Sequence, residues 1–312
     1  MTYRQLGRSG LTVSTVGLGC NALGATIVPE DVPAVVGAAL DAGITFFDTA
    51  DVYGSAPGQS EELLGRALAG RRDEVVVATK FGMDMRGANG PDWGVRGSRR
   101  YIRTAIEKSL RRLGTDHVDL YQIHAYDQVT PLEETLAALH ELVTEGKVRY
   151  LGSSNFTGWQ IVDADWIART EGGTPLISVQ NAYSLLERQV EAEVIPAAEH
   201  VGAGLLPYFP LASGLLTGKY RRGAPAPDGT RLSRRPDRLE AADFDTIEAV
   251  GAFADARGVS MAAVAIGYLA AQEVVGSVIC GASRPEQVRS NASALQWQPT
   301  GEDLAELDEL TR

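Results

Sequence analysis

Four ionisable side chains occupy places in the sequence from which they could act together on one substrate. Asp48, Lys80 and His124 each end a short, mostly apolar segment that is typical of a buried β-strand, and Tyr53 lies on the loop just after Asp48. The carboxyl ends of neighbouring parallel strands meet at one edge of a sheet or barrel, where active sites form. The pattern therefore predicts one site that contains all four groups.

The chemistry of such a site would centre on the Tyr53 phenol. A free phenol has a pKa of about 10, which is too high for an efficient proton donor at neutral pH. A lysine cation at Lys80, held in place by Asp48, would stabilise the phenolate, and we expect it to lower the pKa of Tyr53. Tyr53 could then protonate a carbonyl oxygen to which His124 also forms a hydrogen bond. Each residue could instead be a packing or salt-bridged group, and Lys80 could alternatively form a Schiff base.

The segments around these residues alternate between strand-like and helix-like patterns. Apolar runs bounded by turn residues alternate with segments that place apolar residues at helical spacing. This alternation predicts a (β/α)8 TIM barrel in one domain, 1–312, with a hairpin at residues 3–14 that closes its amino-terminal face. The eight expected strands are 16–19, 44–48, 75–80, 118–124, 148–153, 176–180, 204–208 and 276–281.

Several helix starts carry recognisable capping patterns. Thr130-Pro131-Leu132-Glu133 and Ser283-Arg284-Pro285-Glu286 both have the spacing of a capping box, and Ser260 is the expected N-cap of the helix at 261–271. The segment 225–238 differs, because it is rich in proline, glycine and arginine and shows no periodicity. It follows the seventh expected strand, so we expect either a mobile flap over the site or a solvated surface loop.

Composition narrows the class of protein. The chain is 44% hydrophobic and carries a net charge of -11, which fits a globular fold and argues against nucleic acid or anionic membranes as partners. The first residues lack a signal-peptide pattern and the apolar run at 261–271 is too short to span a bilayer, so we expect a cytoplasmic protein. Cys20 and Cys280 have no metal-binding or redox spacing, and the histidines form no ligand cluster, so we expect reduced core cysteines and no metal.

A doubly wound dinucleotide-binding fold is the competing architecture. Its phosphate-binding loop would follow the first strand as GxGxxG, but the run Gly17-Leu18-Gly19-Cys20-Asn21-Ala22 lacks the third glycine. The barrel is therefore the better prediction.

The sequence resembles the aldo-keto reductase family over essentially the whole chain. The motifs that carry the resemblance occur in family order: DTADVYG (48–54), ATKFG (78–82), DLYQIH (119–124), GKVRYLGSSNF (146–156), VQNAYSLLER (179–188), PYFPLASGLLTGKY (207–220) and GASRPEQVRSN (281–291). Among the branches of that family, the chain is most similar to the bacterial enzymes and the potassium-channel β-subunits.

The resemblance implies an oxidoreductase that reduces an aldehyde or ketone with NADPH. It implies a catalytic tetrad of Asp48, Tyr53, Lys80 and His124, with Tyr53 as the general acid. The residues that it implies for the cofactor run from the nicotinamide to the adenosine end: Cys20, Asn21, Ser154, Asn155, Gln180, Tyr208, Pro210, Leu211, Ser213, Gly214, Leu215, Lys219, Arg231 in the flap, Gly281, Ser283, Arg284, Gln287 and Asn291.

The adenosine end also has a physical argument. A helix that begins after Ser283 presents free N–H groups to an anion, and the planar guanidinium of Arg284 suits a 2′-phosphate. These features favour NADPH over NADH, although a capped helix with a surface arginine would look the same in sequence.

Three departures from the family pattern limit the inference about substrate. Ser290 stands where glutamate is common, Phe209 replaces a serine after the aromatic at Tyr208, and the loop 125–129 lacks a usual proline. Trp93 and Tyr126 are our candidates for the walls of the substrate pocket, and both could be packing aromatics instead. The short carboxyl-terminal region predicts an open pocket that would suit sugars, keto-sugars or other bulky carbonyls.

Two other functions remain open, as does the oligomeric state. A cofactor-binding regulatory subunit would share the fold, and a barrel aldolase would use Lys80 covalently. The chain could be a monomer or a homo-oligomer.

Overall fold

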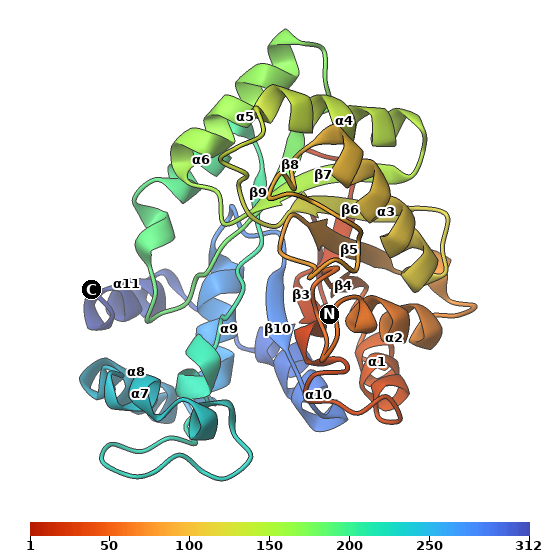
Figure 1. The fold of residues 1–312 in the computed structure, drawn as a ribbon. Helices are drawn as coiled ribbons and strands as arrows, with labels where there is room; N and C mark the ends of the chain where they lie inside the picture. The colour runs from red at the N-terminus through yellow and green to blue at the C-terminus, as the bar shows by residue number, and fades with distance from the viewer.

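A computed structural model describes residues 1–312, and its centre is a sheet of eight parallel strands (Figure 1). The strands run in the order β10-β3-β4-β5-β6-β7-β8-β9, and bridges from Leu205 to Val275 and from Tyr208 to Ile279 join the two edge strands. The predicted (β/α)8 barrel is confirmed. Its strands are β3 (Val16–Gly19), β4 (Phe46–Asp48), β5 (Val76–Phe81), β6 (Val118–Ile123), β7 (Val148–Ser154), β8 (Leu176–Gln180), β9 (Gly204–Leu205) and β10 (Val278–Gly281).

The strand β9 is shorter than the predicted 204–208. Pro207 has no N–H to give to a ladder, and the chain after Leu205 pairs through single hydrogen bonds rather than as a regular strand. The Pro207 carbonyl still accepts from the Ile279 N–H at 2.9 Å, so the barrel closes without a long β9.

Helices surround the sheet (Figure 1), and most of them contribute buried apolar residues to the core that covers it. They are α1 (Val32–Asp41), α2 (Gln59–Ala67), α3 (Arg99–Leu113), α4 (Leu132–Thr144), α5 (Gly158–Thr170), α6 (Val194–Val201), α7 (Pro236–Glu240), α8 (Phe244–Ala256), α9 (Met261–Ala271), α10 (Pro285–Ser293) and α11 (Gly301–Leu310). No single helix is both long and apolar enough to cross a bilayer. The helices α8 and α9 meet such a criterion only as a pair, which is bent by 93°.

The alternation of side chains along each strand separates the core from the site. Inward residues such as Phe46, Ala78 and Leu120 form a small apolar cluster at mid-barrel, whereas their outward neighbours pack against the helices. Two residues further along each strand, the inward position is polar. The site therefore lies directly above an apolar layer, at the carboxyl ends of the strands.

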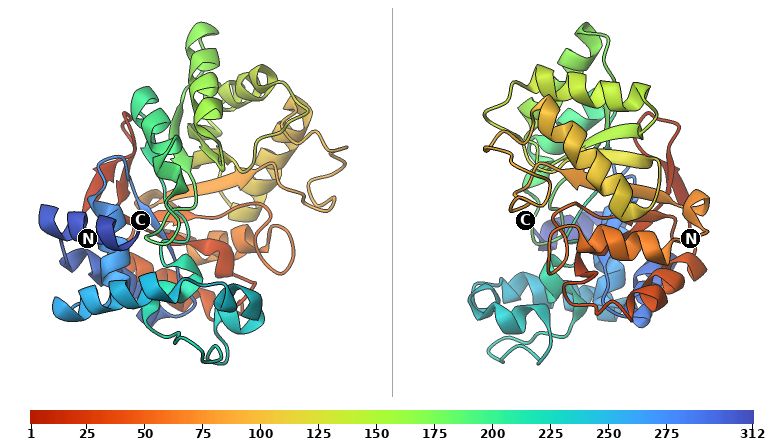
Figure 2. Two further views of the ribbon diagram at one scale, coloured as in Figure 1. Left: turned by 90° about the vertical axis from the view of Figure 1, so that its left-hand side faces the viewer. Right: turned by 45° about the vertical axis from the view of Figure 1, so that its right-hand side comes forward.

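The predicted hairpin forms from β1 (Tyr3–Gln5) and β2 (Thr12–Ser14). Its side chains Leu6, Leu11 and Val13 are buried in the same mid-barrel cluster, so the hairpin closes the amino-terminal face. Figure 2 shows the hairpin and the long loop between β5 and α3 on opposite sides of the barrel.

Two predicted capping boxes do not form. The helix α4 starts after Pro131, and the Thr130 hydroxyl donates to Asp127 Oδ2 at 2.7 Å instead of capping it. At α10 the N-cap residue is Arg284, which makes no side-chain cap, while the Ser283 N–H and hydroxyl both donate to Gln287 Oε1. In both places a nearby side-chain acceptor captures the hydroxyl. By contrast, Ser260 caps α9 as predicted.

The segment 225–238 is only partly irregular. It contains a short 3-10 turn, Arg231–Arg234, and the start of α7, and the side chain of Leu232 is buried against Tyr220 and Leu239. The Leu232 N–H also donates to the Tyr220 hydroxyl at 3.3 Å. Figure 2 shows this segment at the edge of the barrel, on the side away from the hairpin. An apolar anchor therefore holds one end of the predicted flap.

Candidate active site

A buried ion pair lies at the base of the site. Lys80 Nζ donates to Asp48 Oδ2 at 2.6 Å and to the Thr49 carbonyl at 2.9 Å, and the lysine side chain is fully buried. Burial alone disfavours the ammonium, but the negative charge of Asp48 and its hydrogen bond to Lys80 outweigh it, so the pKa of Lys80 lies above its ordinary value. Lys80 therefore carries a fixed positive charge at the carboxyl end of β5.

Two glutamines complete the hydrogen bonding of Asp48. Gln122 Nε2 and Gln180 Nε2 donate to Asp48 Oδ1 at 3.1 and 2.9 Å. These bonds satisfy the second carboxylate oxygen of Asp48. The ion pair with Lys80 alone would leave that oxygen buried without a hydrogen-bond partner. Gln180 was predicted as a cofactor residue, but Gln122 was not singled out. It occupies the inward position two residues before His124, so strand alternation could have identified it.

Tyr53 lies over this pair. Its ring is 5.1 Å from Lys80 Nζ and 5.7 Å from the His124 ring, which it meets edge-on. All four predicted catalytic side chains are therefore together. The predicted lowering of the Tyr53 pKa is wrong, because burial and the negative charge of Asp48 outweigh the attraction of Lys80 and raise the pKa above its ordinary value. The phenol keeps its proton through the neutral range.

His124 is a neutral imidazole in this setting. Burial and the charge of Lys80 lower the pKa of His124 to about 3. Its backbone N–H is bound to the Phe81 carbonyl at 2.8 Å, which fixes the residue at the end of β6, but its buried Nδ1 has no hydrogen-bond partner. A buried nitrogen without a partner is costly unless a ligand satisfies it.

Beside His124, four predicted cofactor residues form one hydrogen-bonded group. Asn155 Nδ2 donates to the His124 carbonyl at 2.9 Å, and Asn155 Oδ1 accepts from the Tyr208 hydroxyl at 2.7 Å. Asn155 has a φ of 59°, which is a sparsely populated backbone conformation that often occurs at binding sites. Ser154 Oγ donates to the Gln180 carbonyl at 2.9 Å. The group lines the barrel mouth between β7 and β9.

The predicted pyrophosphate segment forms a tight, irregular turn. Ser213 and Gly214 have φ values of 60° and 97°, and a Cβ at Gly214 would come within 2.9 Å of Lys219 Nζ. The lysine ammonium thus folds over a glycine-lined turn, which is an arrangement that suits an anion. The other predicted residues of this segment belong to the same turn: Pro210, Leu211 and Leu215.

The flap meets this turn through Phe209. The Arg231 guanidinium lies 5.2 Å from the Phe209 ring, and Phe209 is 40% exposed with a φ of 56°. A cation over an aromatic face is attractive. Phe209, which stands where the family usually has serine, therefore gives Arg231 of the flap a contact that the sequence did not reveal.

The predicted adenosine residues lie at the end of β10 and the start of α10. Gly281, Ser283 and Arg284 are exposed, and Asn291 Nδ2 donates to the Gly281 carbonyl at 3.3 Å. Asn21 approaches Gly281 from the turn after β3, while Cys20 is fully buried beside it, and both cysteines are free. Cys20 can therefore face a ligand only through its backbone.

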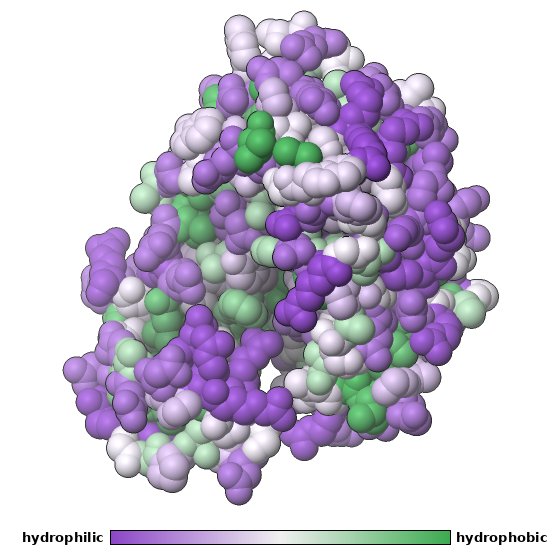
Figure 3. All heavy atoms as spheres, viewed as in Figure 1, coloured by the Kyte–Doolittle hydropathy of each residue, from purple (hydrophilic) through white to green (hydrophobic).

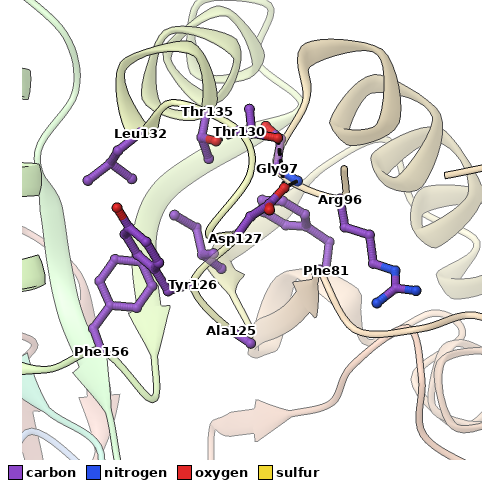
Figure 4. Close-up of a pocket in the computed structure, with 12 residues that line it drawn as sticks. Phe81, Arg96, Gly97, Ala125, Tyr126, Asp127, Thr130, Leu132, Thr135 and Phe156 are labelled. Atoms are coloured by element: carbon purple, nitrogen blue, oxygen red, sulfur yellow. Dashed lines mark hydrogen bonds between the residues drawn. The ribbon is translucent and has the colours of Figure 1, made fainter. Parts of the chain in front are cut away.

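The two predicted pocket walls lie in different surroundings. Trp93 is 69% exposed, and the Arg100 guanidinium lies over its ring, 4.4 Å from the ring centroid. Tyr126 packs edge-on against Phe156 and Trp159. Figure 4 shows Tyr126 beside Phe156 in a small cavity, with its hydroxyl directed toward Leu132 and away from Arg96. Both aromatics make packing contacts, and neither contacts one of the four predicted catalytic residues through an aromatic or hydrogen-bonded pair.

The face that contains the barrel mouth is hollowed near its centre, and polar and apolar residues both surround the hollow (Figure 3). Tyr53 and His124 lie side by side, so both could form hydrogen bonds to one small polar molecule. Comparison with known proteins agrees with this geometry. The model of the Aldo/keto reductase family matches residues 15–312. The chain belongs to this family.

The chain is similar over nearly its whole length to three curated members of known name. It is 37% identical to an L-glyceraldehyde 3-phosphate reductase of Escherichia coli O157:H7, over 99% of this chain and 92% of that protein. It is 38% identical to the uncharacterized oxidoreductase YrpG of Bacillus subtilis (strain 168), over 99% and 96%. It is also 37% identical to a probable voltage-gated potassium channel subunit beta of Oryza sativa subsp. japonica, over 96% and 92%.

Behind the four residues lies a buried polar cluster that the sequence analysis did not identify. Asp51 is fully buried, its N–H donates to the Lys80 carbonyl at 3.1 Å, and its Oδ2 accepts from Asn89 Nδ2 at 2.9 Å. Arg112 Nε donates to the buried Glu61 at 2.6 Å. Arg112 forms its ion pair with Glu61, whereas Asp51 has no ion-pair partner and its Oδ1 has no hydrogen-bond partner. Burial and the charge of Glu61 raise the pKa of Asp51 to about 8.

This cluster makes stability depend on pH. Because the pKa of Asp51 is higher in the folded chain than its ordinary 3.8, the folded state holds a proton that the unfolded state releases. The contribution of this proton to the free energy of unfolding is fully present below pH 4 and is lost as pH rises through about 8. The amide of Asp51→Asn does not titrate. As pH rises from 5 to 8, we therefore expect the Tm of Asp51→Asn to rise relative to that of the wild type by about 2 °C or more.

Thermal unfolding followed by circular dichroism across this pH range tests the prediction. Asp41→Asn, at an exposed aspartate of α1, is the matched control and should not change the pH dependence. Parallel Tm curves for the wild type and Asp51→Asn would contradict it.

Proposed function

We propose that this protein is an NADPH-dependent reductase of aldehydes or ketones, with Tyr53 as the proton donor. The observation that carries the proposal is the arrangement of a protonated phenol between a buried ammonium and a neutral imidazole. A carbonyl oxygen between Tyr53 and His124 would accept hydrogen bonds from both, and the positive charge of Lys80 would stabilise negative charge as it develops there.

Each residue has a separate part in this mechanism. Tyr53 gives its proton to the carbonyl oxygen, and Lys80 stabilises the phenolate that remains. Asp48 holds Lys80 at 2.6 Å, so the ammonium needs no reorganisation during the reaction. His124 stays neutral and orients the oxygen through an N–H. When bound at this mouth, NADPH would supply the hydride that reduces the carbonyl carbon.

The residues around the mouth fit this cofactor. Asn155, Ser154 and Gln180 would hold the carboxamide, and the Tyr208 ring would stack on the nicotinamide. Lys219, over the glycine turn, would meet the pyrophosphate, and Arg231 would close the flap onto it from Phe209. The exposed Arg284 at the start of α10 would hold a 2′-phosphate.

The substrate that we propose is a small polar aldehyde or keto-sugar, including phosphorylated ones. The relative in Escherichia coli O157:H7 that is called an L-glyceraldehyde 3-phosphate reductase supports this class. Purified protein should oxidise NADPH at 340 nm with 4-nitrobenzaldehyde and with glyceraldehyde 3-phosphate. If NADPH binds tightly and no carbonyl in a broad panel is reduced, the proposal is wrong and a regulatory role is favoured.

The regulatory role has one observation in its favour, which is the similarity to a probable voltage-gated potassium channel subunit beta. The complete set of Asp48, Tyr53, Lys80 and His124 in one site favours catalysis over it. The third candidate, a Schiff-base aldolase, needs a neutral lysine amine as nucleophile. Lys80 is a buried ammonium bound to Asp48, so borohydride with a carbonyl substrate should not label the protein.

The cofactor preference can be tested at Arg284. Loss of a charge-assisted hydrogen bond costs about 1.5–3 kcal/mol. We therefore expect Arg284→Ala to lower kcat/KM for NADPH by about 10- to 100-fold, at 1.4 kcal/mol per tenfold, and to leave the value for NADH unchanged.

Steady-state kinetics with both cofactors measure the effect. Arg289→Ala is the matched control, because Arg289 is an exposed arginine on the same helix that pairs with Glu286 at 3.7 Å. An equal loss with NADPH and NADH, or a wild-type preference for NADH, would overturn the assignment of Arg284 to the 2′-phosphate.

A further inference from the structure

A buried serine in the first turn of α2 forms hydrogen bonds to the ends of β3 and β4 and to the loop that carries Tyr53. The Ser60 N–H donates to the Tyr53 carbonyl at 3.1 Å, and the Ser60 hydroxyl donates to the Cys20 carbonyl at 2.8 Å. The same hydroxyl lies 2.9 Å from the Thr49 hydroxyl. Ser60 is fully buried, and the proposed mechanism gives it no part.

The single proton of the Ser60 hydroxyl decides the direction of these bonds. A serine hydroxyl has one O–H donor and two acceptor lone pairs. Because the Cys20 carbonyl can only accept, the Ser60 proton goes to it, and the Thr49 hydroxyl must donate to Ser60. The two hydroxyls therefore form an ordered chain from Thr49 through Ser60 to Cys20, in which each hydroxyl proton has an acceptor.

Each end of this hydroxyl chain lies at a residue of the candidate site. The Thr49 carbonyl accepts from Lys80 Nζ at 2.9 Å, so the backbone of Thr49 helps to hold the ammonium in place. At the other end, Cys20 begins the turn Cys20–Ala22 after β3, which is expected to face the cofactor. Ser60 thus joins the backbone that binds Lys80 to the backbone of the expected cofactor turn.

The residue before Ser60 holds the same two segments. Gln59 Oε1 accepts from the N–H and from the hydroxyl of Ser55, at 3.0 and 2.7 Å. Its side chain also packs on Gly24, where a Cβ would lie only 2.6 Å from the Gln59 side chain. The start of α2 is therefore in direct contact with both the Tyr53 loop and the segment that follows β3.

Packing of α2 on the barrel does not by itself require a hydroxyl at Ser60. Burial of a hydroxyl costs free energy that its hydrogen bonds largely offset, so an apolar side chain of similar size could cover the barrel as well. The partners of the Ser60 hydroxyl are groups of two segments at the barrel mouth and not groups of another helix. Their location favours a role in the alignment of the site.

We propose that Ser60 is a positioning residue that fixes the cofactor turn Cys20–Ala22 relative to Lys80. The inference rests on the proposed reductase function, since the alignment that matters is that of the nicotinamide with the proton donor Tyr53. A displacement of about 1 Å can cost roughly 100-fold in rate when reacting groups must meet in one geometry. Ser60 acts through the placement of its neighbours and exchanges no proton with the substrate.

Ser60→Ala tests the proposal, because it removes the hydroxyl chain and keeps the backbone N–H that binds Tyr53. We expect kcat for the reduction of 4-nitrobenzaldehyde to fall by about 10- to 100-fold. The dissociation constant of NADPH should rise by about 2- to 10-fold, as for the loss of one neutral hydrogen bond. The KM for the aldehyde should change by less than about twofold, since the substrate does not contact Ser60.

Ser14→Ala is the matched control. Ser14 is also a fully buried serine, and its hydroxyl joins the opposite, amino-terminal ends of β3 and β4 through hydrogen bonds to Val16, Thr45 and Phe46. This variant should lower the free energy of unfolding and leave kcat and the dissociation constant of NADPH at their wild-type values. Circular dichroism confirms that each variant is folded.

Two variants of Thr49 separate the hydroxyl from its packing. Thr49→Ser keeps the hydroxyl and loses a methyl group, whereas Thr49→Val keeps the shape and loses the hydroxyl. We expect Thr49→Ser to keep kcat within about twofold and Thr49→Val to resemble Ser60→Ala. The double variant Thr49→Val/Ser60→Ala should be about as slow as either single variant, because all three remove the same chain.

Wild-type kcat and NADPH affinity in Ser60→Ala would overturn the proposal. A loss of kcat that Ser14→Ala shares, or that Thr49→Ser shares with Thr49→Val, would also overturn it, because the effect would then follow stability or packing. The affinity for NADPH is measured without turnover, by the quenching of tryptophan fluorescence. A wild type that binds NADPH and reduces no carbonyl would contradict the proposed function alone, and the affinities of the same variants would still decide the role of Ser60.

Discussion

We expect Tyr53→Phe to lower kcat/KM for the NADPH-dependent reduction of 4-nitrobenzaldehyde by about 10²- to 10⁴-fold, which is the usual contribution of a positioned general acid. The substitution removes one oxygen and keeps the ring that contacts His124 at 5.7 Å. Packing in the site should therefore change little. The dissociation constant of NADPH, measured by the quenching of tryptophan fluorescence, should change by less than about twofold, since binding and proton transfer are separate contributions.

A second measurement separates this role from a structural one. Because burial raises the Tyr53 pKa above its ordinary value, the wild type should keep its proton donor through the neutral range and lose activity only at alkaline pH. That alkaline limb should vanish from the residual activity of Tyr53→Phe. Tyr208→Phe, which removes a hydroxyl bound to Asn155 in the same mouth, is the control and should keep the limb. Full activity in Tyr53→Phe would sink the assignment.

The strand pattern allowed the barrel and the place of the site to be predicted. Apolar segments that end in Asp48, Lys80 and His124 became parallel strands that deliver those groups to one mouth. This works because the side-chain period of a strand is two, so the residue two positions after an apolar inward residue also points inward. The closing hairpin followed the same logic, since its apolar residues fill the inward layer below the site.

The balance of competing effects could not be predicted from the sequence. Lys80 does lower the pKa of Tyr53, but the cost of burying a phenolate is larger, and only coordinates reveal how much of the ring is buried. The capping boxes failed for a similar reason. Thr130 could accept a hydrogen bond from a backbone N–H of the helix or donate its hydroxyl to a carboxylate, and in the fold it donates to Asp127, three residues earlier. The cluster around Asp51 depends on Glu61 and Arg112, which lie on α2 and α3 and meet only in the fold.

Lys80 contributes both to stability and to the proposed catalysis, so Lys80→Met should reduce the free energy of unfolding and the activity. Loss of the ammonium leaves the Asp48 carboxylate buried without its counter-charge, which costs about 3–5 kcal/mol of unfolding free energy. Activity should fall by about 10² or more, because no cation then stabilises the Tyr53 phenolate. Urea denaturation and NADPH oxidation measure the two effects. Lys147→Met is the matched control, since Lys147 pairs with Glu107 and Glu145 nearer the surface and should cost at most about 1 kcal/mol.

The double variant Asp48→Asn/Lys80→Met decides between the two roles of the pair. An asparagine oxygen can still accept from Gln122 and Gln180, which donate to the same carboxylate oxygen at 3.1 and 2.9 Å, and it leaves no buried charge. We therefore expect most of the lost stability to return while activity stays low. Recovery of activity together with stability would mean that Lys80 acts only as a structural partner of Asp48. A single variant as stable as the wild type would mean that the buried carboxylate takes up a proton at little cost. Stability that returns without activity is the result that a catalytic cation requires, because the neutral pair rebuilds the packing and the hydrogen bonds of the barrel but not the positive charge beneath Tyr53.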